Sequence, residues 1–146
     1  MSEFGRLRDL VSWDKRYAVG ITIVDKQHRK LFGITNELYR AIHSSTDQKG
    51  MEASFIKSVH ETVEYVKEHF ATEEELMRAT AYPGYATHKA EHEDFARRIL
   101  NDVATYEGGD TKVIIKFVHF LQSWLVEHIA VTDKALGSHA KNKGQH

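Results

Sequence analysis

Four segments of this 146-residue chain carry apolar residues or potential metal ligands at alternating steps of three and four residues. This is the seam spacing of helices that pack side by side in an antiparallel bundle. The seam residues are Val24, His28, Leu31, Thr35, Leu38 and Ile42; Val59, Thr62, Val66, His69, Glu73 and Leu76; Tyr85, His88, His92, Phe95 and Ile99; and Ile114, Phe117, Leu121, Trp124, His128 and Val131. The pattern predicts an all-α fold, an antiparallel up-down-up-down four-helix bundle.

Short runs of helix-breaking residues separate the four segments. They are SSTDQKG at 44–50, AYPG at 81–84 with the only Pro in the sequence, and EGGD at 107–110, in which Asp110 suits a helix N-cap. Connections this short join antiparallel neighbours. We expect one domain over 1–146, with an irregular N-terminal arm at 1–20, the bundle at about 21–136 and a frayed tail at 137–146.

Composition and charge exclude several classes of function. Lys and Arg number 20 against 21 Asp and Glu, and this net charge of -1 leaves no basic stripe for nucleic acid. The most apolar stretch, 113–131, carries Lys116, Glu127 and His128, which are costly in a bilayer. The absence of Cys excludes disulfides and iron-sulfur clusters, and the N-terminus has no apolar signal region. A cytoplasmic protein that binds neither nucleic acid nor membrane is predicted.

Six seam positions hold His or Glu where an ordinary bundle would have Leu. They are His28, His69, Glu73, His88, His92 and His128. An unpaired buried imidazole or carboxylate is costly, so each of these seams needs a compensating partner. A lone core His more often bonds a backbone carbonyl, but six ligands on four facing seams would also have to satisfy one another. The set therefore predicts a metal site inside the bundle.

The other five His are predicted to lie outside this site. They are His43, His60, His119, His139 and His146. His60 and His119 each precede a seam His by nine residues, which at about 100° per residue puts them on the opposite side of the helix. The remaining three fall at a helix end or in the tail, where a surface position is the default.

Helix geometry also sorts three acidic residues. Glu73 lies about 40° from His69 on the same face, whereas Glu74 lies about 100° farther round, and Glu74→Ala is expected to retain the bound metal. Asp133 follows His128 by five residues, about 140° around an ideal helix. It can join the site only if the helix changes locally, for example through a π-type turn, which is often found at functional sites.

The order of His28, HFATE at 69–73, HKAEH at 88–92 and HIAVTD at 128–133 resembles the hemerythrins, most closely the single-domain bacteriohemerythrins. The similarity extends from about Trp13 to Leu136 and includes VDKQH, HFATEEELM, YPGYATHKAEH and WLVEHIAVTD. It implies a non-haem diiron centre, and this resemblance is what places Asp133 in the site. The implied ligands are His88, His92 and His128 on one iron, His28 and His69 on the other, and Glu73 and Asp133 as bridges.

The ligand count leaves one open position. Two six-coordinate irons offer roughly twelve positions, and five His, two bridging carboxylates and a bridging oxide or hydroxide fill all but one. The open position falls on the iron held by His28 and His69, where the resemblance implies that dioxygen binds, as do small anions such as azide. By resemblance, the pocket wall consists of Leu31, Phe70, Trp124, Leu125 and Ile129, with Leu125 nearest to dioxygen.

The ligand types favour an oxygen-binding protein, for carriage, storage or sensing, over an enzyme. Diiron enzymes of the ferritin-like class use mostly carboxylates with Glu-x-x-His motifs, and this sequence contains no Glu-x-x-His. The alternative is a diiron enzyme that consumes dioxygen, peroxide or nitric oxide. A structural zinc site is a third interpretation, but zinc prefers four ligands.

Overall fold

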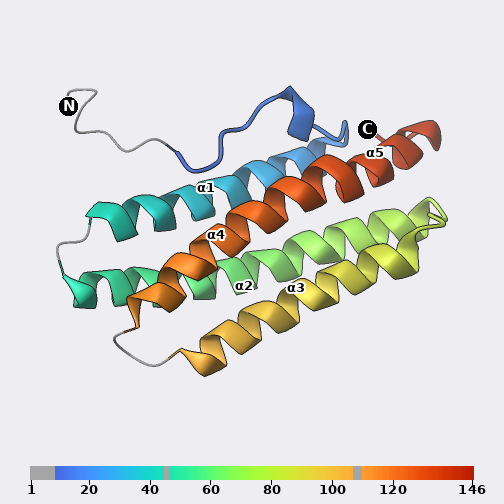
Figure 1. Cartoon of the computed structure of the whole chain (residues 1–146). Helices are drawn as coiled ribbons and strands as arrows, with labels where there is room; N and C mark the ends of the chain where they lie inside the picture. The colour runs from blue at the N-terminus through green and yellow to red at the C-terminus, as the bar shows by residue number, and fades with distance from the viewer. Residues whose placement is uncertain (1–8, 45–46, 107–109) are drawn as a thin grey trace.

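A computed structural model of the chain describes residues 9–44, 47–106 and 110–146. Its elements are a 3-10 turn η2 (Lys15–Tyr17), helices α1 (Thr22–Ser44), α2 (Gln48–Ala79), α3 (Tyr85–Thr105) and α4 (Thr111–Glu127), a π-helical segment η3 (His128–Asp133) and helix α5 (Lys134–Asn142). The segments α4, η3 and α5 follow one another without a break and form the fourth rod of a bundle (Figure 1). No strand occurs among the described residues, so the prediction of an all-α four-helix bundle is confirmed.

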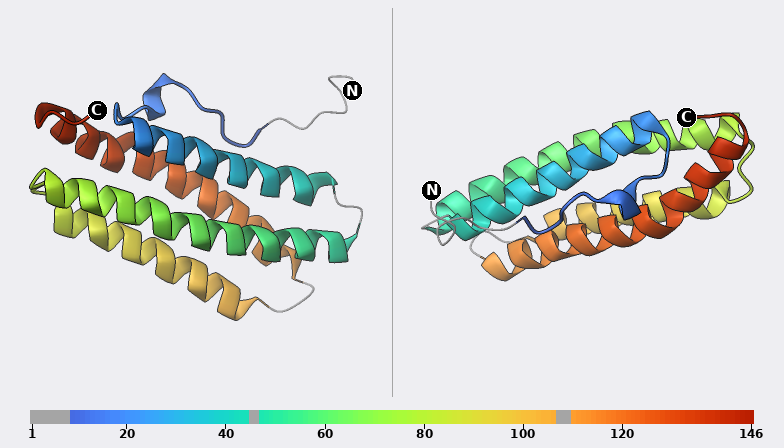
Figure 2. Two further views of the ribbon diagram at one scale, coloured as in Figure 1. Left: turned by 180° about the vertical axis from the view of Figure 1, so that it is seen from behind. Right: turned by 90° about the horizontal axis from the view of Figure 1, so that it is seen from above.

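The rods run alternately up and down, because short connections return each one beside its predecessor (Figures 1 and 2). Asp47 starts α2 by accepting a hydrogen bond from the backbone N–H of Gly50, at 2.7 Å. Asp110 starts α4 in the same way, accepting from the N–H of Lys112 at 3.1 Å, so its predicted capping role is confirmed. Residues 45–46 and 107–109 of the two predicted connections lie outside the described residues.

The described part of the N-terminal arm lies across the face formed by α1 and the fourth rod, as the view from above shows (Figure 2). Asn36 of α1 holds it through two hydrogen bonds, accepting from the N–H of Val11 at 3.0 Å and donating to its carbonyl at 2.7 Å. Tyr17 is buried against Phe32, with ring centroids 5.0 Å apart. The described part of the arm therefore closes one side of the core, while residues 1–8 lie outside the described range.

The expectation of a frayed tail at 137–146 is wrong. Helix α5 continues to Asn142, and Ala140 is completely buried. Gly137 lies so close to the arm that a Cβ there would meet the carbonyl oxygen of Val19 at 2.3 Å. His139 bonds the carbonyl of Thr80 through Nε2, at 2.7 Å. Small side chains thus let the last turns pack against the arm and the α2–α3 connection, which the local sequence did not indicate.

The fourth rod is long and apolar enough, by length and composition, to cross a membrane. It is nevertheless a core element of the bundle, because Ile114, Phe117 and Leu121 are all buried against the other helices. The end of the bundle that holds these residues is filled by apolar side chains, including Leu38 and Phe55. The polar residues of the seams gather toward the other end.

Candidate metal centre

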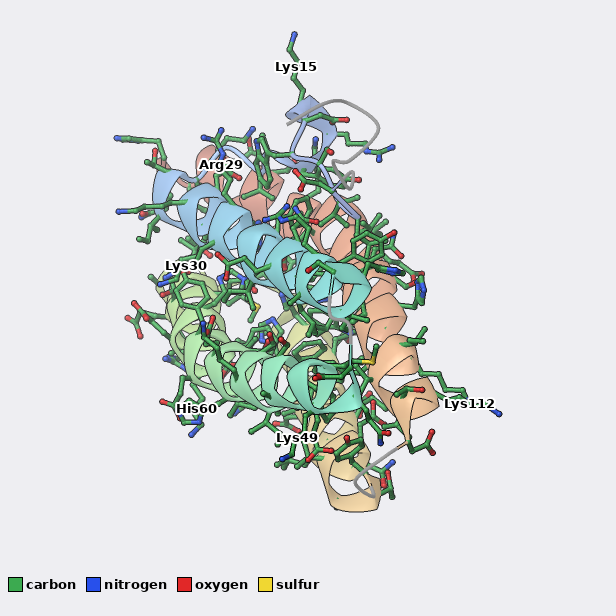
Figure 3. The ribbon with its side chains drawn as sticks, turned by 90° about the vertical axis from the view of Figure 1, so that its left-hand side faces the viewer. Lys15, Arg29, Lys30, Lys49, His60 and Lys112 are labelled. Atoms are coloured by element: carbon green, nitrogen blue, oxygen red, sulfur yellow. The ribbon has the colours of Figure 1, made fainter. Side chains whose placement is uncertain are left out.

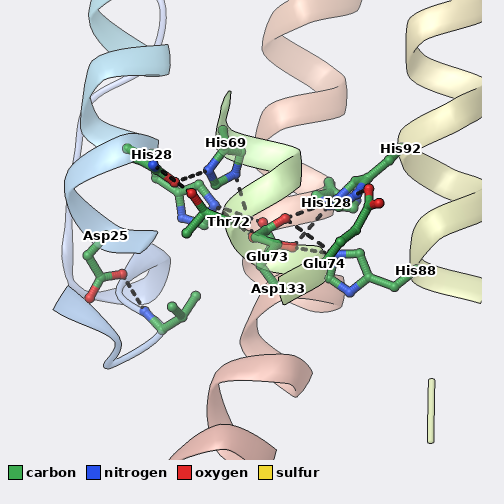
Figure 4. A network of polar contacts seen from close by, with 12 residues as sticks. Asp25, His28, His69, Thr72, Glu73, Glu74, His88, His92, His128 and Asp133 are labelled. Carbon is green, nitrogen blue, oxygen red and sulfur yellow. Dashed lines mark hydrogen bonds and ion pairs between the residues drawn. The ribbon is translucent and has the colours of Figure 1, made fainter. Parts of the chain in front are cut away.

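All seven predicted metal ligands converge, in two overlapping groups of potential ligands. One group comprises Glu73, His88, His92, His128 and Asp133, and the other comprises His28, His69, Glu73 and Asp133. Within each group, one ligand atom per residue lies within 4.8 Å of all the others. Every one of the seven residues is buried, and they come from α1, α2, α3 and η3 (Figure 4).

Glu73 is shared between the two groups. Its Oε1 faces the Nε2 atoms of His92 and His88, at 3.0 and 3.4 Å. Its Oε2 faces the Nε2 atoms of His28 and His69, both at 3.5 Å. One carboxylate thus presents a different oxygen to each set of imidazoles (Figure 4).

Asp133 divides its oxygens in the same way. Its Oδ1 lies 2.9 Å from Nε2 of His88 and 3.0 Å from Nε2 of His128. Its Oδ2 lies 2.8 Å from Nε2 of His28. Both carboxylates are therefore arranged as bridges between a group of three His and a group of two.

The local change that brings Asp133 into the cluster is a π-helical segment over His128–Asp133. A π-turn holds more residues than an α-turn, so it carries Asp133 round to the face of His128. The same change carries Val131 outward, where its side chain is 66% exposed. The predicted seam position of Val131 is wrong for this reason, whereas the π-type turn that Asp133 required is present.

The donor set fits metal cations. Adjacent ligands of an octahedral ion at about 2.1 Å lie about 3.0 Å apart, which is close to the nitrogen–oxygen spacings around Asp133. Among the described residues, Nε2 of His28, His88 and His128 and both oxygens of Asp133 are buried without a hydrogen bond of acceptable geometry. Unsatisfied atoms that point at one another inside a core require a compensating charge.

His69 makes a hydrogen bond through Nδ1, the ring nitrogen that faces away from the cluster, and this bond fixes Nε2 as the nitrogen that faces the cluster. Thr72 donates its hydroxyl hydrogen to the carbonyl of Glu68 and therefore accepts from the amide nitrogen of Gln27, both at 3.0 Å. The amide oxygen of Gln27 is thereby turned to Nδ1 of His69, at 2.8 Å. Nδ1 must carry the proton, and the lone pair of Nε2 is free for a metal.

Two carboxylates orient His92 and His128 similarly. Nδ1 of His128 lies 2.8 Å from Oε2 of Glu91, which also accepts from the hydroxyl of Thr132 at 2.9 Å. Nδ1 of His92 lies 3.2 Å from Oε2 of Glu74. The side chain of Glu74 therefore reaches from α2 to the back of a ligand on α3, a contact that its position about 100° round the helix from Glu73 did not predict.

Sequence reasoning did not find Gln27, Glu74 or Glu91. Each lies directly beside a ligand in the motifs VDKQH, HFATEE and HKAEH, and that adjacency was the available signal. It is weak, because residues adjacent on a helix point in directions about 100° apart. Which of them meets an imidazole of a neighbouring helix depends on how the helices pack.

The electrostatics of the cluster follow from burying two carboxylates among five imidazoles. Burial alone would lower the pKa of His28 and His88, but the close carboxylates of Asp133 and Glu73 raise it to about 9 in both. Burial lowers the pKa of His69 to about 4. Although burial would raise the pKa of Glu73 and Asp133, the surrounding imidazoles hold both carboxyls well below their usual range. The cluster is a site for positive charge, and without metal it draws protons.

The remaining His lie outside the cluster, as predicted. His43, His60, His119 and His146 are exposed, and His60 projects from the bundle in Figure 3, among surface lysines. His139 is half-buried and bonds a backbone carbonyl, so the surface position expected for it is wrong. It still lies outside the cluster, as expected.

Two of the five residues expected in the pocket wall contact ligand rings of the cluster. Phe70 stacks on His92 with ring centroids 3.7 Å apart, and Trp124 stacks on His128 at 4.2 Å. Both rings therefore lean on the group of three His. The other three, Leu31, Leu125 and Ile129, are buried aliphatic side chains of α1, α4 and η3.

Comparisons with known proteins agree with this geometry. Residues 19–140 match the family described as the Hemerythrin HHE cation binding domain. The chain is 32% identical over 133 residues to a bacteriohemerythrin of Stenotrophomonas maltophilia, an alignment that covers 90% of this chain and 82% of the relative. It is 30% identical over 125 residues to a hemerythrin of Themiste dyscrita, covering 86% and 89%. A crystal structure of wild-type hemerythrin shares the fold with a TM-score of 0.70 and 24% identity, covering 88% of this chain and 96% of that one. The chain belongs to the hemerythrin family.

Proposed function

We propose that this protein binds dioxygen reversibly at a non-haem diiron centre, for oxygen carriage, storage or sensing. Its iron ligands are His88, His92 and His128 at one position, His28 and His69 at the other, and Glu73 and Asp133 as bridges. A bridging oxide or hydroxide completes the pair. Membership of a family that binds dioxygen at such a centre supports the proposal.

The observation that carries the proposal is the division of both carboxylates between two unequal sets of imidazoles. Glu73 and Asp133 each supply one oxygen to either position, so two cations are expected side by side. The set with His28 and His69 has one imidazole fewer, so the open coordination position falls there. When bound, a ferrous pair supplies the two electrons and the open position that dioxygen requires.

The protein residues keep this position small and dry. Leu31, Leu125 and Ile129 are buried aliphatic side chains, and an apolar wall disfavours water and anions. Phe70 and Trp124 hold the rings of His92 and His128 by stacking against them. We infer that these five side chains form the dioxygen pocket, with Leu125 nearest to the ligand and azide as a competing small anion. The absence of catalytic turnover and the cytoplasmic location stay predictions.

Anaerobic reconstitution with Fe(II) tests the function. We expect two irons per chain, a visible absorption band on exposure to air, and loss of that band when dioxygen is removed. The matched control is the same chain loaded with Zn(II), which should stay colourless. Iron at a ratio near one would refute the paired site. If the band persisted after dioxygen was removed and the protein continued to consume dioxygen, a diiron enzyme would be the better interpretation than an oxygen carrier.

A further inference from the structure

The five clustered imidazoles differ on the side that faces away from the cluster. Each presents Nε2 inward, so Nδ1 carries a hydrogen that needs an acceptor. Carboxylates accept it from His92 and His128, whereas an amide accepts it from His69. Among the described residues, Nδ1 of His28 and of His88 has no hydrogen-bond partner. Of the rings that have an acceptor, the two in the group of three His bond a carboxylate and the one in the group of two bonds an amide.

Two negatively charged groups support the position of three imidazoles. Glu91 lies 2.8 Å from Nδ1 of His128, and its side chain is 42% exposed. Glu74 lies 3.2 Å from Nδ1 of His92, and its side chain is 19% exposed. Both come from helices that already supply ligands, α3 and α2, so the spacing between carboxylate and imidazole is set by bundle packing.

The position of two imidazoles has only neutral support. Gln27 accepts from His69 at 2.8 Å, and Thr72 fixes the orientation of its amide. Gln27 is itself buried, so its amide is held away from water. A neutral acceptor leaves the imidazole less basic than an ionised one does.

Resting on the proposed diiron function, we propose that Glu74 and Glu91 are positioning residues that make the two metal positions unequal. They strengthen binding and favour the higher charge state at the position of His88, His92 and His128. Because Gln27 is a neutral acceptor, His69 donates less electron density to a metal at the open position. A less basic ligand set of this kind would favour the ferrous state of an iron bound at the open position, which suits reversible binding.

The extra imidazole by itself makes the first position bind more tightly, so unequal affinities in the parent protein are not sufficient evidence. Isosteric variants separate the two causes. Glu91→Gln and Glu74→Gln keep an acceptor oxygen and remove the charge. Glu93→Gln on α3 and Glu75→Gln on α2 are matched controls, because both side chains are exposed.

The first experiment is an anaerobic titration of the apo protein with Co(II). Calorimetry and the visible spectrum of the bound ion monitor each addition. The parent should show a tighter and a weaker step. Glu91→Gln and Glu74→Gln should each weaken the tighter step by about tenfold to a hundredfold and leave the weaker one unchanged. The two control variants should match the parent. An equal loss in both steps, or no loss in either, would overturn the proposal.

The second experiment measures the midpoint potentials of the iron-loaded protein. Glu91→Gln should raise the midpoint potential of the iron at the position of His88, His92 and His128. The rise should be about 59 mV for each factor of ten by which the variant weakens ferric binding more than ferrous binding. Gln27→Glu should lower the other potential and speed oxidation in air. If Gln27→Glu left both potentials unchanged, the role of the neutral acceptor would be refuted.

The two proposals fail in different ways. If the parent took up only one Co(II) and one iron, the diiron function itself would be wrong. If it bound two irons and released dioxygen normally, but the charge-removing variants behaved like the controls, only the inequality of the two positions would be wrong.

Discussion

The two ends of the bundle are built from the same four rods but are stabilised differently. At one end, Phe55, Ile114 and Phe117 fill the seams and need nothing beyond one another. At the other end, the equivalent seams carry five imidazoles and two carboxylates, and among the described residues Nε2 of His28, His88 and His128 and both oxygens of Asp133 lack a hydrogen-bond partner. Helix periodicity can thus build a layer whose stability is conditional. The apolar end is stable by itself, and the polar end depends on a cation or on protons.

Removing the metal should have the largest effect. Metal that binds only the folded state stabilises it by about 4 kcal/mol per site at a thousandfold excess over Kd. We expect the apo protein to melt well below the iron-loaded one in a calorimetric scan. Hydrogen exchange should show that the loss of protection is greatest near His28 and His88 and least near Phe117. Uniform loss along the rods would break the comparison between the two ends.

The second prediction removes a bridge. Glu73→Ala should abolish the paired site, because Glu73 is the carboxylate that both groups of His share. Glu75→Ala, on an exposed face of the same helix, should retain two irons. Iron analysis after reconstitution measures the difference, and equal iron contents in the two variants would exclude the bridging role. Glu74→Ala is unsuitable as the control because Glu74 bonds His92.

The third prediction concerns the apolar end. Phe117→Ala should cost about 3–5 kcal/mol of unfolding free energy, because it leaves a cavity beside Phe55, whose ring centroid is 5.3 Å away. The cost should be the same with and without iron, since the cavity lies away from the cluster. Denaturant unfolding of both forms gives the two values. A cost that disappears on iron loading would mean that the two ends are coupled.

The fourth prediction uses pH on the apo form. The pKa of His28 and His88 is raised to about 9 in the fold, against about 6.5 when unfolded. Their contribution to stability is therefore complete below about pH 6.5 and is lost as pH rises toward 9. His69, with its pKa lowered to about 4, stays neutral in the folded state throughout this window.

Apo stability should consequently fall between pH 6.5 and 9, whereas metal binding improves with deprotonation of the ligands. The gap between the melting temperatures of the iron-loaded and apo forms should widen across this window. If the melting temperatures of the two forms changed in parallel with pH, metal would not be replacing protons in this cluster.

The smallest expected change is kinetic. Leu125→Ala should retain both irons and still bind dioxygen, but should oxidise to the inactive diferric form roughly tenfold faster, equivalent to about 1.4 kcal/mol of barrier. It should also bind azide faster, because a shorter side chain admits water and anions. Leu121→Ala, one turn away in the apolar core, is the control. If Leu125→Ala oxidised at the parent rate, Leu125 would not be the barrier.

Much of the site could be predicted because ligands and apolar residues shared one periodicity. His28, His69, Glu73, His88, His92 and His128 lie on the seams that the spacing indicated, and all are buried. Asp133 needed a family resemblance, since an ideal helix points it away, and only the π-helical segment explains its place. Val131 was misplaced by the same departure from regular geometry.

Spacing along the chain was enough to predict the four helices, their antiparallel order and six of the seven converging ligands, whereas Asp133 was placed by the family resemblance. Tertiary structure alone decided which carboxylate oxygen meets which imidazole, and that Gln27, Glu74 and Glu91 support different rings. It also decided that α5 packs closely against the arm, where Gly137 leaves no room for a Cβ beside Val19. The physical reason is that these features depend on the distance between side chains of different helices, which packing sets and local periodicity does not encode.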